Sequence, residues 1–240
     1  MATFVLVAGA CWGGWSWTRV APLLRAAGHD VWTPTPTGVG DRVHLATPAI
    51  DLDTHVTDVA NLLFYEDLTD VTLVGWSYGG MVIAGVAEQA PERLAQLIYG
   101  DASVPGDGQS DYDCEGATEA ERAADRSTAA AAGMPGYWLP VDYLRAGIPD
   151  AADQAWVLAR ATPHPLATLE QPVRLGNPAA AALPRAYVYC SEGKGEDSSS
   201  RRFAAMYRSA PGWRYREIAA NHLAPITAPR ALADAFLSLV

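Results

Sequence analysis

The pentapeptide Gly-Trp-Ser-Tyr-Gly at residues 75–79 places a serine between glycines, a pattern typical of an activated nucleophile. An apolar run at residues 70–74 precedes it and predicts a buried strand, and apolar residues at helical spacing follow it. A serine on such a sharp strand-to-helix turn stands above the sheet edge, with a helix N-terminus favouring negative charge below it. The sequence therefore predicts that Ser77 is a nucleophile rather than part of an ordinary glycine-rich turn.

A serine nucleophile needs a base, and the chain has five histidines. His222 follows a predicted strand at residues 213–218, and reactive groups gather at the carboxyl ends of strands in an open α/β sheet. We therefore predict His222 as the base. The positions of His29 and His55 indicate surface residues. The remaining two, His44 and His164, lie in a long loop and in the segment between the fourth and fifth predicted strands.

The base needs an acid that fixes its tautomer and stabilises the imidazolium. Asp101 ends the predicted strand 94–100, and Glu192 and Asp197 follow the predicted strand 185–190. Both loops leave the carboxyl ends of strands near the nucleophile, so the residues alone keep these alternatives open. Stabilising a developing oxyanion takes two N–H donors, which we expect from Tyr78, next to the nucleophile, and from Ala10 in the glycine-rich first loop.

Six predicted strands would position these groups, and most of them are short apolar runs bounded by turn residues. They lie at residues 4–8, 30–33, 70–74, 94–100, 185–190 and 213–218. Helices are expected between them: residues 20–27 after an N-cap at Ser16, a helix capped by Asp53 or Thr54, one from residue 79, and residues 227–239 at the end. The alternation predicts an α/β fold, a mostly parallel six-stranded sheet with helices on both faces.

Residues 104–183 interrupt this alternation, with many alanines, prolines, glycines and acids. We predict a helical cap inserted into a core of residues 1–103 and 184–240. The alternative is a disordered linker. The large aromatic residues of this segment argue against it, since disordered segments contain few aromatic residues. Those of this segment are Tyr112, Tyr137, Trp138, Tyr143 and Trp156.

Charge and cysteine content exclude several classes of partner. The chain carries 27 acids and 17 bases, a net charge of −10, which would repel nucleic acid and anionic membranes. No apolar run has the roughly 18–20 residues of a membrane span, and the N-terminus resembles no signal peptide, so we expect a cytoplasmic protein. The three cysteines are widely spaced without a CxxC pair, which favours neither disulfides nor a metal site. A homodimer is compatible with the sequence.

Together these motifs resemble the α/β-hydrolase superfamily over essentially the whole chain. Residues 9–17 and 22–29 are similar to the plant methylesterase and hydroxynitrile lyase group, and residues 162–166 and 171–175 resemble small bacterial esterase-like relatives. The resemblance implies a six-stranded sheet, a helical cap, a Ser-Asp-His triad and no cofactor.

The resemblance also bears on the choice of acid. The position that holds the acid in the plant enzymes is Gly193 here, whereas some haloalkane dehalogenases and lipases carry it at the end of the fourth strand. Asp101, in a Tyr-x-Asp-Ala-x-x-Pro segment, matches that second pattern, so the resemblance favours Asp101 over Glu192 and Asp197.

Several positions depart from the related group. Ala8 stands where a histidine usually precedes Gly9, and tryptophans replace the usual residues at positions 12 and 76. We therefore expect an apolar pocket lined by Trp12, Trp76, Trp138 and Leu223. The lyases carry a threonine and a lysine at the positions of Gly9 and Leu223, so cyanohydrin cleavage is not expected.

The predicted activity is hydrolysis of a carboxylic ester of a small aromatic or polyketide-like molecule through an acyl-enzyme. A non-hydrolytic tailoring enzyme of secondary metabolism, such as a cyclase, a lactone-forming enzyme or a lyase, is the alternative, and a ligand-binding receptor is a third. Residues 104–183 hold eleven acids and five arginines, which favours a neutral or cationic substrate. The arginine-rich, lysine-poor composition fits a bacterial source.

Overall fold

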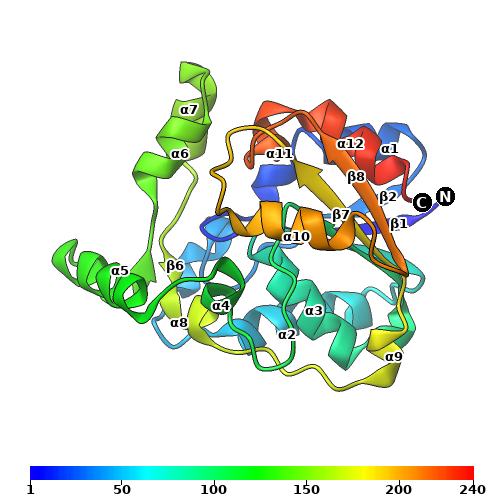
Figure 1. Cartoon of the computed structure of the whole chain (residues 1–240), viewed down its shortest axis with the longest axis horizontal. Coiled ribbons are helices and arrows are strands. Elements are labelled where there is room, and N and C mark those ends of the chain that lie inside the picture. Colours follow the sequence, from blue (N-terminus) through cyan, green and yellow to red (C-terminus); the bar gives the residue numbers. More distant parts are fainter.

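The computed structural model describes residues 1–240 and has a central sheet of six strands (Figure 1). In sheet order β2-β1-β3-β4-β7-β8, every adjacent pair is parallel. The strands are β1 (Thr3–Val7), β2 (Asp30–Trp32), β3 (Val71–Trp76), β4 (Leu94–Gly100), β7 (Arg185–Cys190) and β8 (Trp213–Ile218). The predicted α/β class and parallel six-stranded sheet are confirmed.

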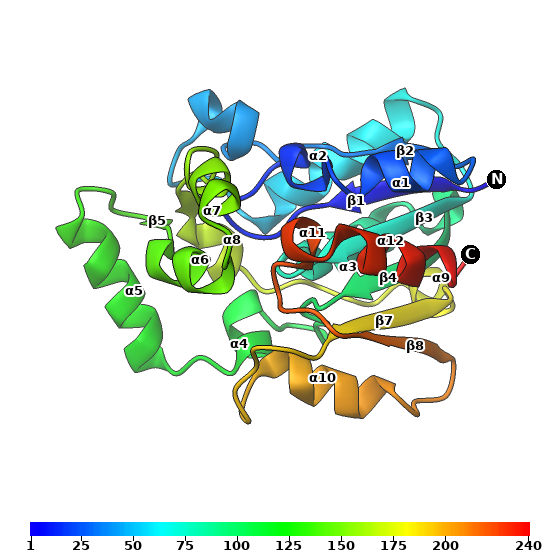
Figure 2. The same cartoon turned by 90° about the horizontal axis from the view of Figure 1, so that it is seen from above.

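Helices cover both faces of the sheet and divide the core in two. Because successive strand residues point to opposite faces, Val5 and Val7 join one buried cluster whereas Phe4 and Leu6 join the other. The first cluster packs under α2 (Leu52–Tyr65), α3 (Gly79–Gln89) and α10 (Ser199–Tyr207). The second packs under α1 (Ala21–Ala26) and α12 (Pro229–Leu237), which lie side by side in Figure 2.

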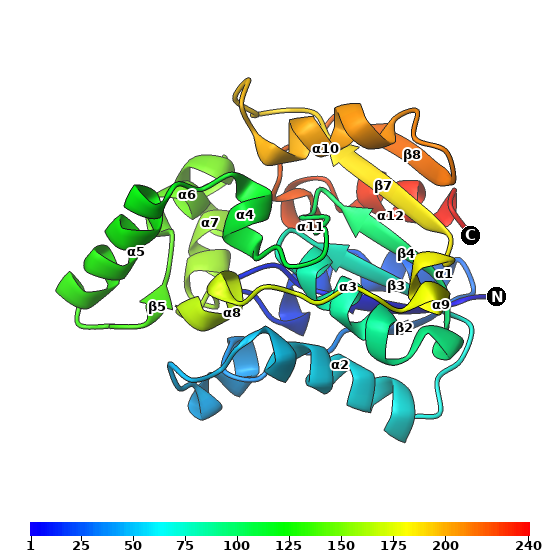
Figure 3. The ribbon, with the colours of Figure 1, turned by 60° about the horizontal axis from the view of Figure 1, so that its bottom comes forward.

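The insert, residues 104–183, joins β4 to β7; most of it lies beyond the carboxyl ends of the strands, and its last residues run back along the sheet to the start of β7 (Figures 2 and 3). It is mainly helical, with one antiparallel pair of two-residue strands, β5 (Tyr137–Trp138) and β6 (His164–Pro165). Its helices are α4 (Asp111–Glu115), α5 (Glu119–Ala131), α6 (Val141–Gly147), α7 (Ala151–Leu158), α8 (Leu166–Glu170) and α9 (Pro178–Ala181).

Two predicted helix starts are wrong. Ser16 is not an N-cap: it lies buried in a 3₁₀ helix, η1 (Gly14–Trp17), where its hydroxyl donates to the Gly13 carbonyl. Helix α1 begins later, with proline in its first turn and no side-chain cap. The cap of α2 is Asp51, whose carboxylate accepts from the Thr54 N–H, rather than Asp53 or Thr54.

The predicted C-terminal helix, residues 227–239, corresponds to α12, and a separate short helix that was not predicted, α11 (Ala224–Thr227), precedes it. Pro229 disfavours helical geometry at Ala228, whose backbone has left the helical region at φ −142° and ψ 50°. Two short 3₁₀ helices, η2 (Gly40–Leu45) and η3 (Pro91–Arg93), complete the fold. No helix is long and apolar enough to cross a bilayer.

Candidate active site

Ser77 occupies a tight turn between β3 and α3, and its backbone is left-handed, with φ of +58°. The glycines around it are required by contact. A Cβ on Gly75 would lie 2.4 Å from the Gly79 carbonyl oxygen, and one on Gly80 would lie 2.0 Å from the Ser103 carbonyl oxygen. No side chain fits at these points, so the sequence pattern reflects close approach of backbone segments below the serine.

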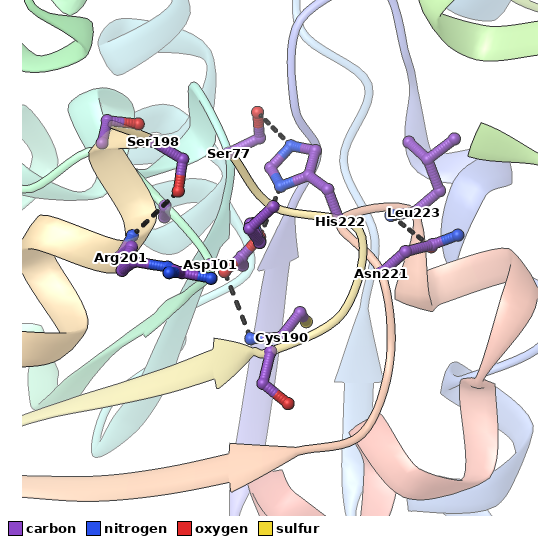
Figure 4. A network of polar contacts seen from close by, with 12 residues as sticks. Ser77, Asp101, Cys190, Ser198, Arg201, Asn221, His222 and Leu223 are labelled. Atoms are coloured by element: carbon purple, nitrogen blue, oxygen red, sulfur yellow. Dashed lines mark hydrogen bonds and ion pairs between the residues drawn. The ribbon is translucent and has the colours of Figure 1, made fainter. Parts of the chain in front are cut away.

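A continuous relay of hydrogen bonds joins Ser77, His222 and Asp101 (Figure 4). Ser77 Oγ lies 3.0 Å from His222 Nε2, and His222 Nδ1 lies 2.6 Å from Asp101 Oδ2. Because the carboxylate can only accept, Nδ1 carries the proton and Nε2 is free to accept from the serine. The serine, the histidine and Asp101 come from the carboxyl ends of three different strands, β3, β8 and β4.

Asp101 is held firmly, with a fully buried side chain. Its Oδ1 accepts from the Cys190 N–H at 3.2 Å, and its Oδ2 also pairs with the ammonium of Lys194, 7% exposed. Burial opposes ionisation, but His222 and Lys194 outweigh it and hold the pKa of Asp101 below its usual value. Sequence reasoning missed Lys194, although it is the only lysine and follows β7.

The two alternative acids lie elsewhere. Glu192 is exposed, and its backbone N–H donates to the Ala220 carbonyl. Asp197 is also exposed, at the rim of the cavity above Ser77. The structure thus brings Asp101, and neither of these two residues, to His222.

Ala10 and Tyr78 lie beside the serine, as the oxyanion prediction requires. Neither backbone N–H donates a hydrogen bond within the chain, and both residues line the cavity. The loop that carries Ala10 runs close to the nucleophile, since a Cβ on Gly9 would lie 2.9 Å from Ser77 Cβ. Both N–H groups are therefore available to a ligand atom bound at Ser77.

A cavity of about 690 Å³ opens above Ser77, between the sheet and the insert. The four predicted pocket residues all line it: Trp12, Trp76, Trp138 and Leu223. Trp76 also has a structural role, because its indole N–H donates to the His222 carbonyl at 2.9 Å. Its ring lies perpendicular to that of Trp12, at 5.0 Å between centroids. These two tryptophans are buried, so they pack the core and face the cavity at once.

One wall of the cavity, formed mainly by the insert, is acidic. The sequence predicted an acidic insert but not which of its acids face the cavity. The acids of this wall are Asp111, Glu115, Glu121, Asp125 and, from outside the insert, Asp197. Asp111 is buried and accepts from the Ser103 hydroxyl at 2.7 Å. Burial and the neighbouring Glu115 raise the pKa of Asp111 to about 7. The single lysine or arginine among the lining residues is Lys194, which is already paired with Asp101.

Of the histidines outside the relay, His55 differs from its predicted surroundings. His55 is fully buried, so its interpretation as a surface residue is wrong. Its Nε2 donates to the Thr37 carbonyl at 2.9 Å, and its Nδ1 accepts from the Tyr78 hydroxyl at 3.0 Å. His29 is partly exposed and accepts from the Ala2 N–H, and His44 is exposed. Burial lowers the pKa of His55, which favours the neutral ring that these bonds require.

Comparison with known proteins gives relatives over the whole chain. The model described as "Alpha/beta hydrolase family" matches residues 4–235. The carbendazim hydrolyzing esterase of Nocardioides sp. (strain SG-4G) is 38% identical over 246 residues, covering 100% of both chains. Methylesterase 1 of Arabidopsis thaliana is 36% identical over 113 residues, which cover 42% of this chain and 40% of the plant enzyme.

Among solved structures, an extracellular alpha/beta-hydrolase from a Paenibacillus species superposes with a TM-score of 0.82. It covers 99% of this chain and 98% of its own, and at 23% identity it supports the fold alone. Taken with the sequence relatives, it confirms the resemblance predicted from the motifs.

Proposed function

The chain belongs to the alpha/beta hydrolase family, and from this premise we propose that it hydrolyses carboxylic esters through Ser77, His222 and Asp101. The observation that carries the proposal is the relay, in which the serine hydroxyl, both imidazole nitrogens and a buried carboxylate are in hydrogen-bond contact. The names of the relatives, an esterase over the full chain and a methylesterase over part of it, agree with this class of reaction.

In the first half-reaction, Ser77 Oγ attacks the ester carbonyl carbon while His222 Nε2 takes the hydroxyl proton. The carbonyl oxygen becomes an oxyanion, which the N–H groups of Ala10 and Tyr78 stabilise. The tetrahedral intermediate collapses, the imidazolium gives its proton to the departing alcohol oxygen, and the acyl group stays on Ser77. Asp101 keeps Nδ1 protonated and stabilises the imidazolium.

In the second half-reaction, water attacks the acyl-enzyme and gives a proton to His222 Nε2. The second tetrahedral intermediate releases the carboxylic acid, and the proton returns from His222 to Ser77 Oγ. The free enzyme is regenerated by the same groups.

We further propose that the substrate is a compact aromatic ester, neutral or cationic. Tryptophans supply flat apolar surface beside Ser77, and the insert supplies the acidic wall. An anionic ester would meet that wall with no unpaired lysine or arginine to compensate. We also propose that the insert acts as the cap of the site.

The test is turnover of p-nitrophenyl acetate and butyrate by the wild type and by the Ser77→Ala and His222→Ala variants. We expect turnover that either substitution abolishes, and labelling of Ser77 by a serine-directed phosphonate. Absence of both turnover and labelling would refute covalent ester hydrolysis and favour the non-hydrolytic alternative.

A matched pair of aromatic methyl esters tests the substrate class. One carries a trimethylammonium group and the other a carboxylate at the same ring position. We expect the cationic ester to have the lower KM, by about tenfold or more. Carbendazim, named for the full-length relative, belongs in the same assay. Equal or reversed preference would contradict the role of the acidic wall.

A further inference from the structure

His164 is a buried histidine, 1% exposed, that the proposed reaction does not use. It lies in the insert, on β6, and it is not among the residues that line the cavity. Both ring nitrogens are nevertheless engaged. Nδ1 accepts from the Cys11 N–H at 3.1 Å, and Nε2 lies 2.8 Å from Thr168 Oγ1, whose proton goes to the Pro165 carbonyl.

This pattern fixes the tautomer of His164. Since a backbone N–H can only donate, Nδ1 must be unprotonated and the ring proton must be on Nε2. Burial and the neighbouring His55 hold the pKa of His164 well below its usual value, which agrees with a neutral ring. The imidazole is therefore a fixed acceptor directed at the loop that follows β1.

The residue that His164 holds is next to Ala10, whose N–H is one proposed oxyanion donor. Cys11 has a left-handed backbone, with φ of +70°, a conformation that a residue other than glycine adopts only when its surroundings impose it. The insert supplies a second bond to the same residue, because the Thr162 N–H donates to the Cys11 carbonyl at 3.0 Å. Bonds to both its N–H and its carbonyl fix the orientation of the peptide groups on either side of Cys11.

His164 also contacts the residue that carries the other donor. Its ring packs edge-on against that of Tyr78, at 4.9 Å between centroids. The Tyr78 hydroxyl is held in turn by His55, whose ring lies 5.6 Å from that of His164. One imidazole thus bonds to the neighbour of the first donor and packs against the second.

We propose that His164 is a positioning residue for the oxyanion hole, through which the insert sets the separation and direction of the Ala10 and Tyr78 N–H groups. The expected effect of His164 on kcat rests on the proposed ester hydrolysis. Its expected effect on the geometry of the first loop rests only on the bond to Cys11. Because these donors act on the tetrahedral intermediate, their displacement lowers kcat far more than it changes ground-state binding.

The decisive comparison is between His164→Leu and His164→Asn. Leucine removes the acceptor, whereas the asparagine Oδ1 can occupy the place of the imidazole Nδ1 and accept from Cys11. With p-nitrophenyl butyrate we expect His164→Leu to lower kcat about 10- to 100-fold, with KM changed less than about threefold. His164→Asn should recover most of the loss. The serine hydroxyl adds to the carbonyl of a trifluoromethyl ketone and gives a tetrahedral oxyanion. The affinity of the variants for this inhibitor should therefore fall in parallel with their kcat/KM.

Amide hydrogen exchange supplies a readout that does not depend on turnover. The peptide covering residues 9–12 should exchange faster in His164→Leu than in the wild type, and His164→Asn should resemble the wild type. The exposed His44→Leu substitution is the matched control and should change neither rate nor exchange.

The proposal is overturned if His164→Leu keeps kcat within twofold, if His164→Asn is as impaired as His164→Leu, or if ketone affinity stays constant while kcat falls. Failure of the proposed function differs from these results, because it would appear as a wild type with no turnover and no phosphonate labelling. In that case the oxyanion role falls with it, and unchanged exchange at residues 9–12 would reject the structural role as well.

Discussion

Replacement of Asp101 by asparagine should separate catalysis from stability at this site. In the structure, Asp101 Oδ2 accepts from His222 Nδ1 and pairs with Lys194 at the same time. Asparagine keeps the shape but removes the charge, and its NH₂ group can face Nδ1 and drive the proton to Nε2. The histidine could then no longer accept from Ser77. In a Ser-His-Asp triad this change lowers kcat about 10⁴-fold, or about 5 kcal/mol at 1.36 kcal/mol per factor of ten.

The same substitution leaves the Lys194 ammonium, 7% exposed, without its counter-charge. Breaking a buried ion pair by removing one partner costs roughly 3–5 kcal/mol. Folding lowers the pKa of Asp101 below its usual value, so the ionised carboxylate stabilises the fold at every pH above that usual pKa. This stabilisation is lost as the pH falls through the lower pKa of the folded state. At neutral pH, Asp101→Asn should therefore be both inactive and less stable.

A second substitution distinguishes the two effects. Asp101→Asn combined with Lys194→Met removes the orphaned charge, so urea unfolding should recover most of the lost stability while kcat for p-nitrophenyl butyrate stays about 10⁴-fold down. The matched control is Glu192→Gln, at an exposed acid after β7, which should keep kcat within about twofold. An Asp101→Asn variant within tenfold of the wild type, or a Glu192→Gln variant with the larger loss, would refute this assignment of the acid.

Three further substitutions test other parts of the site. Because folding raises the pKa of Asp111 to about 7, this residue makes the fold less stable as the pH rises from about 4 through 7. In Asp111→Asn, the free energy of unfolding in urea should therefore change less with pH over that range. Parallel curves of unfolding free energy against pH for the variant and the wild type would contradict this. Gly75→Ala places a Cβ 2.4 Å from the Gly79 carbonyl oxygen and should cost about 1–3 kcal/mol or more by urea unfolding, whereas Gly176→Ala, with no atom within 4 Å, should not. Trp138→Ala should raise KM for aromatic esters about tenfold while kcat for p-nitrophenyl acetate stays within about threefold; a uniform loss would argue against side-chain contact with the substrate.

Most of the sheet was predictable because its strands carry strong local signals. Most of the six strands are short apolar runs that end at turn residues, although β8 carries three charged residues, and the structure places each strand within two residues of its predicted bounds. Strands β5 and β6 have two residues each and exist only because the insert folds Trp138 against His164, a pairing with no local signature. The break between α11 and α12 did have a signal, since Pro225 and Pro229 stand one helical turn apart.

Without the family resemblance, which favoured Asp101, the residues alone predicted the triad only to the level of its strand ends. Sequence order places Ser77, Asp101, Glu192 and His222 after different strands of one parallel sheet, but it does not give the distances between the loops. Which acid contacts His222 depends on loop geometry. Asp101 has a left-handed backbone, with φ of +48°, and its buried carboxylate pairs with Lys194, whereas Glu192 is exposed to solvent.

The two buried histidines show where a sequence signal existed and where none could. His55 shares the apolar face of α2 with Leu52, Val56 and Val59, at helical spacing, so its burial follows from the same periodicity that predicted the helix. The partner of His164 is Cys11, 153 residues away, and the bond has meaning only once the insert has folded back onto the first loop. A local bond from the Trp12 N–H to the Gly9 carbonyl, at 3.3 Å, closes the turn around the left-handed Cys11, and the insert holds both peptide groups of Cys11 in addition. If His164 positions the proposed oxyanion donors through this contact between distant segments, substitutions in the insert that touch no substrate are expected to change the rate of the chemical step.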